Sequence, residues 1–194
     1  MTEAQTETGA EGHSTRAAPG DLELLRAFLN TYELEEERDL GPGEMAAWLS
    51  ARGLLEPGEA LSETDRRRAV AFREALRDVL EIEHQHERES AALRLLNATA
   101  KDAPLTVRFE STDAASLVPL SGGVEGAVAR MLGIAFASIE QGTWSRLKTC
   151  KRDSCRWVFF DHSRNRSSNW CSMEVCGNRT KVERFRDRKA AATP

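Results

Sequence analysis

The chain has 194 residues, a formal net charge of −4, 40% hydrophobic residues and 6% aromatic residues. This length allows one ordinary hydrophobic core and one small additional module. No apolar run approaches the roughly 20 residues of a membrane-spanning helix, and residues 1–20 lack the apolar stretch of a secretion signal. We therefore expect a cytoplasmic protein with no membrane partner.

The N-terminal part of the sequence predicts a set of helices. Residues 1–20 are polar and poor in bulky side chains, which predicts a disordered tail. Apolar residues recur at helical spacing over residues 21–34, and Gly41-Pro42-Gly43 interrupts this pattern. A short helix that ends at Gly53 is predicted next. One long helix should then run over residues 62–96, from a Ser N-cap through a polar stretch.

Two strands and an apolar helix are predicted to follow. Residues 105–110 and 116–120 alternate in polarity around a polar turn, which predicts a small β hairpin. Residues 124–141 form a helix with little polar surface, so we expect it at the centre of the core. Its apolar stripe consists of Val128, Met131, Leu132, Ala135, Phe136 and Ile139.

All four cysteines lie near the end of the chain, in two pairs that each enclose four residues. Two such pairs can bring four thiolates to one tetrahedral ion, and a site of four thiolates leaves no position for a substrate. We therefore predict a structural Zn²⁺ held by Cys150, Cys155, Cys171 and Cys176. The alternatives are two disulfides, which a reducing cytoplasm disfavours, and a redox pair, which usually encloses only two residues.

The residues around these cysteines resemble a known family. The first pair lies in Cys150-Lys-Arg-Asp-Ser-Cys155-Arg-Trp157, and the second ends in Cys176-Gly177-Asn178-Arg179. This pattern closely resembles the CGNR-type zinc finger, which in bacterial proteins follows an N-terminal domain called ABATE. Phe28-Leu29-Asn30-Thr31 looks like the opening segment of that domain. The family is regarded as stress-induced transcription regulators, so the resemblance implies a DNA-binding regulator.

The finger is predicted over residues 144–190. Two short strands, residues 147–149 and 156–160, should flank the first cysteine pair, and the second pair should lie at the start of the last helix. With an ABATE-like helical domain over residues 21–141, the predicted fold class is α+β. It combines a mainly helical N-terminal domain that carries a small β hairpin with a C-terminal four-cysteine zinc finger of two short strands and a helix.

Charge is divided unevenly along the chain. Residues 144–189 contain 13 Lys and Arg against 5 Asp and Glu, a net charge of +8, so the rest of the chain carries −12. Four thiolates and one Zn²⁺ would leave the finger at +6. A basic module of this kind attracts polyanions, so nucleic acid, and DNA first, is the expected partner.

Helix rotation separates the residues of the final helix into two groups. Val175, Val182 and Phe185 share one arc, which marks the expected buried side. The basic residues opposite them, together with two arginines between the cysteine pairs, are the predicted nucleic-acid contacts: Lys181, Arg184, Arg188, Arg164 and Arg166. Asn178 and Arg179 are predicted to support the metal site from behind its ligands. The alternative for the basic face is an ordinary solvated surface.

Other candidate chemistry is weak. His84 and His86 lie two residues apart in a predicted helix, where their side chains point about 200° apart and cannot hold one ion together. His162 lies near the cysteines, but four thiolates already complete a tetrahedron. No catalytic arrangement stands out, so we predict no catalytic residue and no enzyme activity.

The sequence therefore predicts a zinc-dependent nucleic-acid-binding protein, most simply a DNA-binding transcription regulator. One alternative is a zinc-stapled protein-interaction module whose basic face docks an acidic surface. Another is an RNA-binding protein that stacks bases on Trp157, Phe159, Phe160 or Trp170. A small-molecule effector of the N-terminal domain and a homodimer are further open alternatives.

Overall fold

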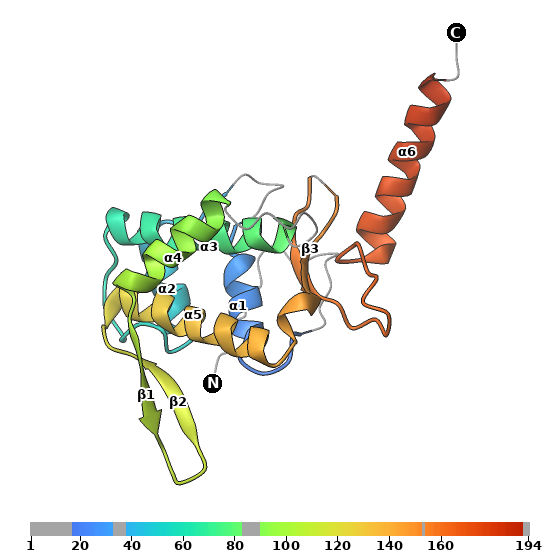
Figure 1. Ribbon diagram of the computed structural model, residues 1–194. Helices are drawn as coiled ribbons and strands as arrows, with labels where there is room; N and C mark the ends of the chain where they lie inside the picture. Colours follow the sequence, from blue (N-terminus) through green and yellow to red (C-terminus); the bar gives the residue numbers. More distant parts are fainter. Residues whose placement is uncertain (1–16, 33–37, 83–89, 153, 192–194) are drawn as a thin grey trace, which may run out of the picture.

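The computed structural model describes residues 17–32, 38–82, 90–152 and 154–191, and it leaves out the side chains of residues 82, 184, 185 and 187–191. Within this part of the chain, helices surround one core, and two antiparallel hairpins and a final helix extend it (Figure 1). The helices are α1 (Leu22–Leu29), α2 (Pro42–Ser50), α3 (Glu63–Ile82), α4 (Ala91–Asp102), α5 (Gly123–Glu140) and α6 (Asn178–Ala191). The strands are β1 (Leu105–Phe109), β2 (Ala115–Pro119), β3 (Leu147–Thr149) and β4 (Val158–Phe160). The predicted α+β fold class is confirmed.

Helix α5 lies at the centre of the N-terminal part, as its apolar sequence predicted. It packs against α1, α3 and α4, and α1 lies between α3 and α5 (Figure 1). Val128, Met131 and Ala135 of its stripe are buried in the core. Phe136 and Ile139 were predicted to be buried as well, but they are 56% and 54% exposed. They lie on the outer face of α5, whereas Ala135 and Ser138, at the same end of the helix, are buried.

The predicted single helix over residues 62–96 is wrong. Helix α3 ends at Ile82, and a separate helix α4 begins at Ala91 and packs back against α3. Ser90 starts α4 as an N-cap, since its Oγ accepts a hydrogen bond from Leu93 N at 3.2 Å. His84 and His86 lie outside the described residues.

Helix α1 is shorter than predicted because two buried arginines bind the backbone and side chains at its C-terminal end. Arg77 donates to the carbonyl of Leu29, and Arg73 donates to Thr31 Oγ1 at 3.1 Å and to Asp39 Oδ1 at 2.8 Å. Both arginines are at most 2% exposed. Cationic side chains at this position satisfy carbonyls that have no partner within the helix.

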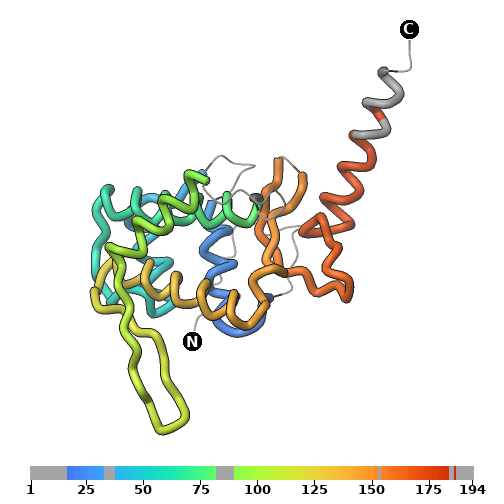
Figure 2. The backbone as a smooth tube through the Cα atoms, in the orientation of Figure 1, coloured from blue at the N-terminus to red at the C-terminus, as the bar shows by residue number. Residues whose placement is uncertain are grey.

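The predicted hairpin of β1 and β2 is confirmed, and it projects from the helical body (Figure 2). Leu105 and Leu117 lie on one of its faces, where they contact α5 at Gly133. Farther along the same face, Val107 is 56% exposed and Phe109 is 78% exposed.

The second hairpin joins the N-terminal part to the end of the chain. Strands β3 and β4 pair antiparallel, with Leu147 opposite Phe160. Leu147, Val158 and Phe160 belong to the same hydrophobic core as α1, α3 and α5. The strands therefore complete the core of the helical part, and the loop between them carries the first two cysteines.

Candidate metal centre and nucleic-acid interface

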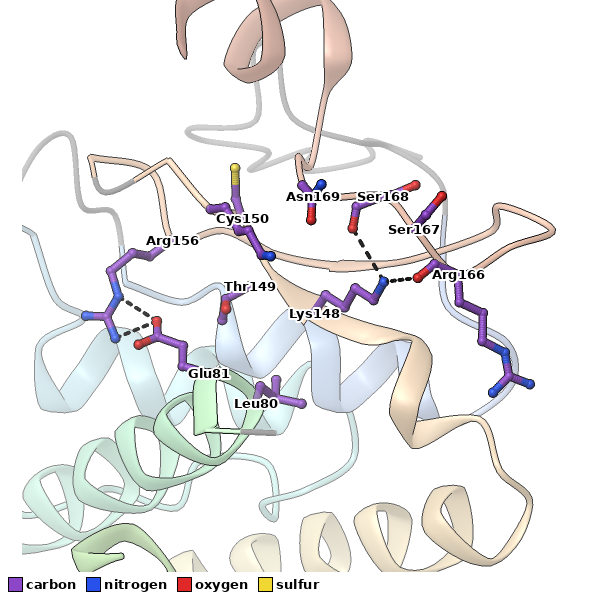
Figure 3. A pocket seen from close by; sticks show the side chains of 11 residues that line it. Leu80, Glu81, Lys148, Thr149, Cys150, Arg156, Arg166, Ser167, Ser168 and Asn169 are labelled. Atoms are coloured by element: carbon purple, nitrogen blue, oxygen red, sulfur yellow. Dashed lines mark hydrogen bonds and ion pairs between the residues drawn. The ribbon is translucent and has the colours of Figure 1, made fainter. Parts of the chain in front are cut away.

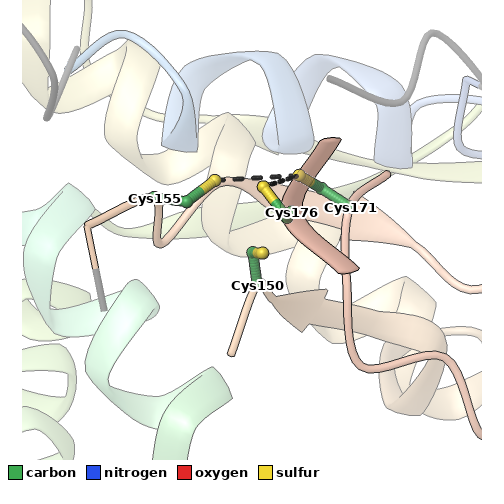
Figure 4. A group of neighbouring side chains, drawn as sticks. All are labelled: Cys150, Cys155, Cys171 and Cys176. Carbon is green, nitrogen blue, oxygen red and sulfur yellow. Dashed lines mark hydrogen bonds between the residues drawn. The ribbon is translucent and has the colours of Figure 1, made fainter. Parts of the chain in front are cut away.

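The four cysteine sulfurs converge on one point (Figure 4). All four Sγ atoms lie within 4.8 Å of one another, with 3.7 Å between Cys155 and Cys171 and 3.6 Å between Cys171 and Cys176. A tetrahedral ion with Zn–S bonds of about 2.3 Å requires sulfurs about 3.8 Å apart. The four side chains are free thiols and are buried. Their spacing therefore fits one tetrahedral metal ion and is too long for a disulfide bond.

Local backbone hydrogen bonds hold each pair of cysteines in a turn. The first turn is closed by Cys155 N, which donates to Arg152 O at 2.8 Å, and by Cys150 N, which donates to Trp157 O at 2.9 Å. A single π-helical turn (Met173–Gly177) follows Cys171 and contains Cys176, and Ser172 caps it by accepting from Val175 N at 3.3 Å. Cys176 lies in this turn, directly before α6, as the sequence predicted.

Aromatic side chains cover the cysteine cluster. Phe159 is 3% exposed and packs against the sulfurs, with Trp157, Trp170 and Val175 around it. Because successive residues of a strand point to opposite faces, Phe159 reaches the cysteines while Val158 and Phe160 reach the main core. Trp157 packs against the same cluster, so it lies on the same side as Phe159.

Crowding of four thiols opposes their joint ionisation when no cation is present. Hydrogen bonds from Cys155 and Cys171 lower the pKa of the Cys150 thiol. The hydrogen bonds to Cys150 raise the pKa of the Cys155 and Cys171 thiols. A divalent cation among the sulfurs would remove this conflict, because it stabilises all four thiolates.

Gly177 and Asn178 complete the turn behind the cysteines. A Cβ atom on Gly177 would collide with Met173 Sδ and would lie 3.2 Å from Trp170 Cδ1. Asn178 Nδ2 donates to Glu174 O at 3.0 Å, so this side chain supports the metal turn through its backbone. Arg179, the other residue predicted to support the site, is exposed.

A buried carboxylate organises the loop between the two cysteine pairs. Asp161 is 1% exposed and accepts hydrogen bonds from Lys148 Nζ at 2.7 Å, Ser163 N at 2.9 Å and Ser168 N at 3.0 Å. Burial raises the pKa of Asp161, but these hydrogen bonds outweigh it and hold the pKa well below its usual value. This role of Lys148 was not predicted from the sequence, in which only its position in an expected strand beside the cysteines marks the residue.

Helix α6 extends away from the rest of the molecule (Figures 1 and 2). Its described contacts with other elements are mainly with the π-helical turn from which it starts, and Arg152 pairs with Glu183 at 3.5 Å. The prediction that Val182 lies on a buried side is wrong, because Val182 is 49% exposed. The helix points outward from the metal turn, so no described core side chain covers this face.

The predicted nucleic-acid contacts lie at the same end of the molecule. Lys181 on α6 and the loop residues Arg164 and Arg166 are exposed, while the side chains of Arg184 and Arg188 lie outside the described part. His162 points away from the metal cluster, since its Nε2 lies 3.0 Å from Ala17 O and its ring packs edge-on against Phe160. It is therefore not a fifth metal ligand in this arrangement.

Comparison with known families matches two segments of the chain. Residues 10–140 match the ABATE family, described as "Putative stress-induced transcription regulator", and residues 146–189 match the CGNR zinc finger. No curated protein matches the sequence. No described helix is both long and apolar enough to cross a membrane.

Proposed function

The chain belongs to the ABATE family and carries a CGNR zinc finger, and from this premise we propose that it is a DNA-binding transcription regulator. The proposal assigns the finger over residues 144–190 to DNA contact and the part over residues 21–141 to a regulatory role. Its main support is the basic helix that extends from the cysteine cluster into solvent.

In this proposal, Cys150, Cys155, Cys171 and Cys176 hold one Zn²⁺. When bound, the ion would supply structural stability, since four thiolates leave it no open position. The residues of the chain then fix where α6 points: Ser172 caps the metal turn, and Asn178 ties the first turn of the helix to Glu174 O. The metal site would thus orient the helix without taking part in chemistry.

Helix α6 has the shape and charge that DNA binding requires. A single α-helix fits the major groove of B-DNA, which is about 12 Å wide. Lys181, Arg184 and Arg188 follow one another at i, i+3 and i+7, so they share one face of this helix. Arg164 and Arg166 would add phosphate contacts from the neighbouring loop.

The distribution of charge along the chain is consistent with DNA binding at the finger. The finger region carries +8 and the remaining residues carry −12. DNA phosphates attract the basic finger region and repel the acidic remainder of the chain, so DNA would contact the molecule at its finger end.

The alternatives have less support. RNA recognition commonly stacks bases on exposed aromatic rings. Phe159 and Phe160 are buried, and Trp157 and Trp170 are half-buried. A protein partner for the basic helix would need an acidic surface, and a docked protein would show a shallower dependence on salt than DNA does. We propose no enzyme activity.

A salt titration tests the proposal. We expect the logarithm of the affinity of the full chain for a mixed-sequence DNA duplex to fall linearly and steeply with the logarithm of the salt concentration. A weak interaction with no such dependence would contradict DNA binding. Binding of an acidic protein surface without binding of duplex DNA would favour the protein-interaction alternative.

A further inference from the structure

A polar cavity lies between the end of α3 and the finger (Figure 3). Its volume is about 500 Å³, within the range of small-molecule sites. Strand β3 forms one side, with Lys148 and Thr149, and the residues after it continue to Lys151. The loop over residues 166–169 lies on another side, and Glu81 and Arg156 close a third. We call this cavity the junction pocket.

The junction pocket is rich in hydrogen-bond donors. Four cationic side chains line it against the single carboxylate of Glu81, and Arg156 already pairs with that carboxylate at 2.8 Å. Lys148 is bound by Asp161 and by the carbonyl of Arg166 at 2.6 Å. Within the described residues, Lys151 and Arg166 pair with no carboxylate, and Arg166 donates only to the neutral hydroxyl of Ser145, at 3.3 Å. The charges that stay available are therefore those of Lys151 and Arg166.

Neutral donors add to these charges. In the described part of the chain, the hydroxyls of Thr149, Ser167 and Ser168 and the amide of Asn169 donate no hydrogen bond. Thus the pocket offers two cations without a carboxylate partner and four neutral donors, while its one carboxylate is already paired. A ligand that matches this lining must be an anion with several oxygen acceptors.

The backbone conformation of two pocket residues also marks this cavity. Only two non-glycine residues of the described chain have positive φ, Arg156 at 46° and Arg166 at 50°. Both line the junction pocket. Glycine adopts this conformation without steric cost, whereas arginine does not. Strained residues of this kind cluster at functional sites, and here both strained positions lie on one cavity.

We propose that the junction pocket binds a phosphate group. The phosphate could belong to a nucleic-acid backbone that runs from α6 across the finger, in which case the proposal rests on the proposed function. It could instead belong to a small phosphorylated molecule, which would then contact α3 and the finger together. In both cases we assign Lys151, Thr149 and Ser167 to the phosphate oxygens. The guanidinium of Arg166 points away from Thr149 (Figure 3) and donates to Ser145, so it would add its charge by turning toward the phosphate. Cys150 also lines the pocket, but its sulfur points away from Lys148 and Thr149 (Figure 3).

The test uses the metal-loaded full chain with inorganic phosphate as the probe, at constant ionic strength with chloride as the compensating ion. We expect saturable shifts of the amide resonances of Thr149, Lys151 and Ser167. Lys151→Gln should weaken phosphate binding about tenfold, as expected for the loss of one charge-assisted hydrogen bond. Shifts that grow linearly without saturation would overturn the proposal.

A second variant separates binding from folding. Arg166→Gly removes the guanidinium and suits the positive φ, so we expect an unchanged or raised melting temperature together with about tenfold weaker phosphate binding. Lys101→Ala is the matched control, because it removes an exposed cation from α4, away from the pocket and from the proposed DNA contacts, and should leave phosphate binding unchanged. Equal phosphate affinity in the parent and Arg166→Gly would contradict the assignment of this residue.

Two further titrations identify the source of the phosphate. If a short DNA duplex displaces inorganic phosphate, the pocket holds a backbone phosphate. If DNA and phosphate bind independently, and adenosine 5′-monophosphate binds while adenosine does not, the pocket holds a small phosphorylated molecule. Failure of the two proposals is distinguishable: DNA binding without saturable phosphate binding overturns only the pocket, and phosphate binding without DNA binding overturns only the proposed function.

Discussion

The side chain of Asn30 and the backbone of Val158 form a reciprocal pair of hydrogen bonds. Asn30 Nδ2 donates to Val158 O, and Val158 N donates to Asn30 Oδ1, each at 2.8 Å. The amide thus gives β4 the pair of hydrogen bonds that a neighbouring strand would otherwise supply. Through this pair, a residue just after α1 fixes the strand that leads from the first cysteine pair back into the core.

Asn30→Ala should destabilise the protein. Val158 is fully buried, so its N–H group would lose its partner without gaining water, and its C=O group would keep only the weak hydrogen bond from Arg26 Nη1 at 3.5 Å. The expected cost is about 1–3 kcal/mol. For a chain of this size the melting temperature should fall by about 2–4 °C for each kcal/mol. Thermal melts followed by circular dichroism measure the change.

Asn97→Ala is the control for this prediction. Asn97 is exposed on α4, and its replacement should change the free energy of unfolding by no more than about 0.5 kcal/mol. Equal melting temperatures for Asn30→Ala and the parent would show that the two hydrogen bonds between Asn30 and Val158 contribute nothing to stability.

Cys155→Ser and Cys176→Ser should abolish stoichiometric metal binding, because each removes one of four converging sulfurs. The purified parent should contain one equivalent of zinc and each variant clearly less, as measured by elemental analysis. A strong chelator should also lower the melting temperature of the parent. Full zinc occupancy with unchanged affinity in either variant would refute the ligand assignment.

Replacing Lys181, Arg184 and Arg188 together by Ala should weaken DNA binding for every sequence. If each residue neutralises one phosphate, the slope of log affinity against log salt should become shallower by about 3 × 0.9. Zinc content should stay at the parental value. The matched control replaces three exposed cations on other parts of the chain, Lys101, Arg108 and Arg130, and should leave the slope unchanged. If both triple variants give the same slope of log affinity against log salt, α6 does not contact DNA.

Asp161→Asn should lower stability at neutral pH by about 3 kcal/mol, since it leaves the largely buried Lys148 without its charged partner. The folded-state pKa of Asp161 lies below its unfolded value of about 3.9, so this contribution is present above that pH and is lost as the pH falls below it. The difference in stability between parent and variant should therefore shrink at pH below about 4. Both proteins are compared at each pH with released zinc measured in parallel, because acid also protonates the thiolates. A difference that stays constant from pH 7 to pH 3 would contradict the role of the carboxylate.

A fragment that ends at Gln141 should fail to melt cooperatively. It lacks four buried side chains of the main core, Trp144, Leu147, Val158 and Phe160. Each contributes about 1.5–3 kcal/mol when buried, and their sum is comparable to the whole stability of a typical domain. A fragment that ends at Ser163 retains these residues and serves as the comparison. A cooperative melt of the shorter fragment would show that the helical part folds alone.

Local patterns predicted most of this structure. Cysteine spacing located the metal cluster, strand alternation located the hairpin of β1 and β2, and the apolar run over residues 124–141 located the central helix. The strands around the first cysteine pair were expected as part of the zinc finger, and β4 (Val158–Phe160) is shorter than the predicted strand over residues 156–160. The break between α3 and α4 was missed because polar residues with helical propensity join two helices whose apolar faces meet only in three dimensions. The role of Asn30 was missed for a related reason, since its partner lies 128 residues away and no local pattern connects them. Only the resemblance of Phe28-Leu29-Asn30-Thr31 to a known domain pointed to this segment.

Helix α6 has little part in holding the molecule together, because no described side chain after Gly177 is buried. Substitutions at such positions usually change stability little. The exposed face of α6 is the proposed DNA contact. Its sequence can therefore diverge among related proteins without loss of the fold. In contrast, every residue of β4 is buried, with Phe159 against the cysteines and its two neighbours in the main core. The residues proposed to contact DNA thus lie in one segment, and the residues that hold the core lie in another. Under this proposal, substitutions in α6 can change which DNA is bound while the rest of the protein stays unchanged.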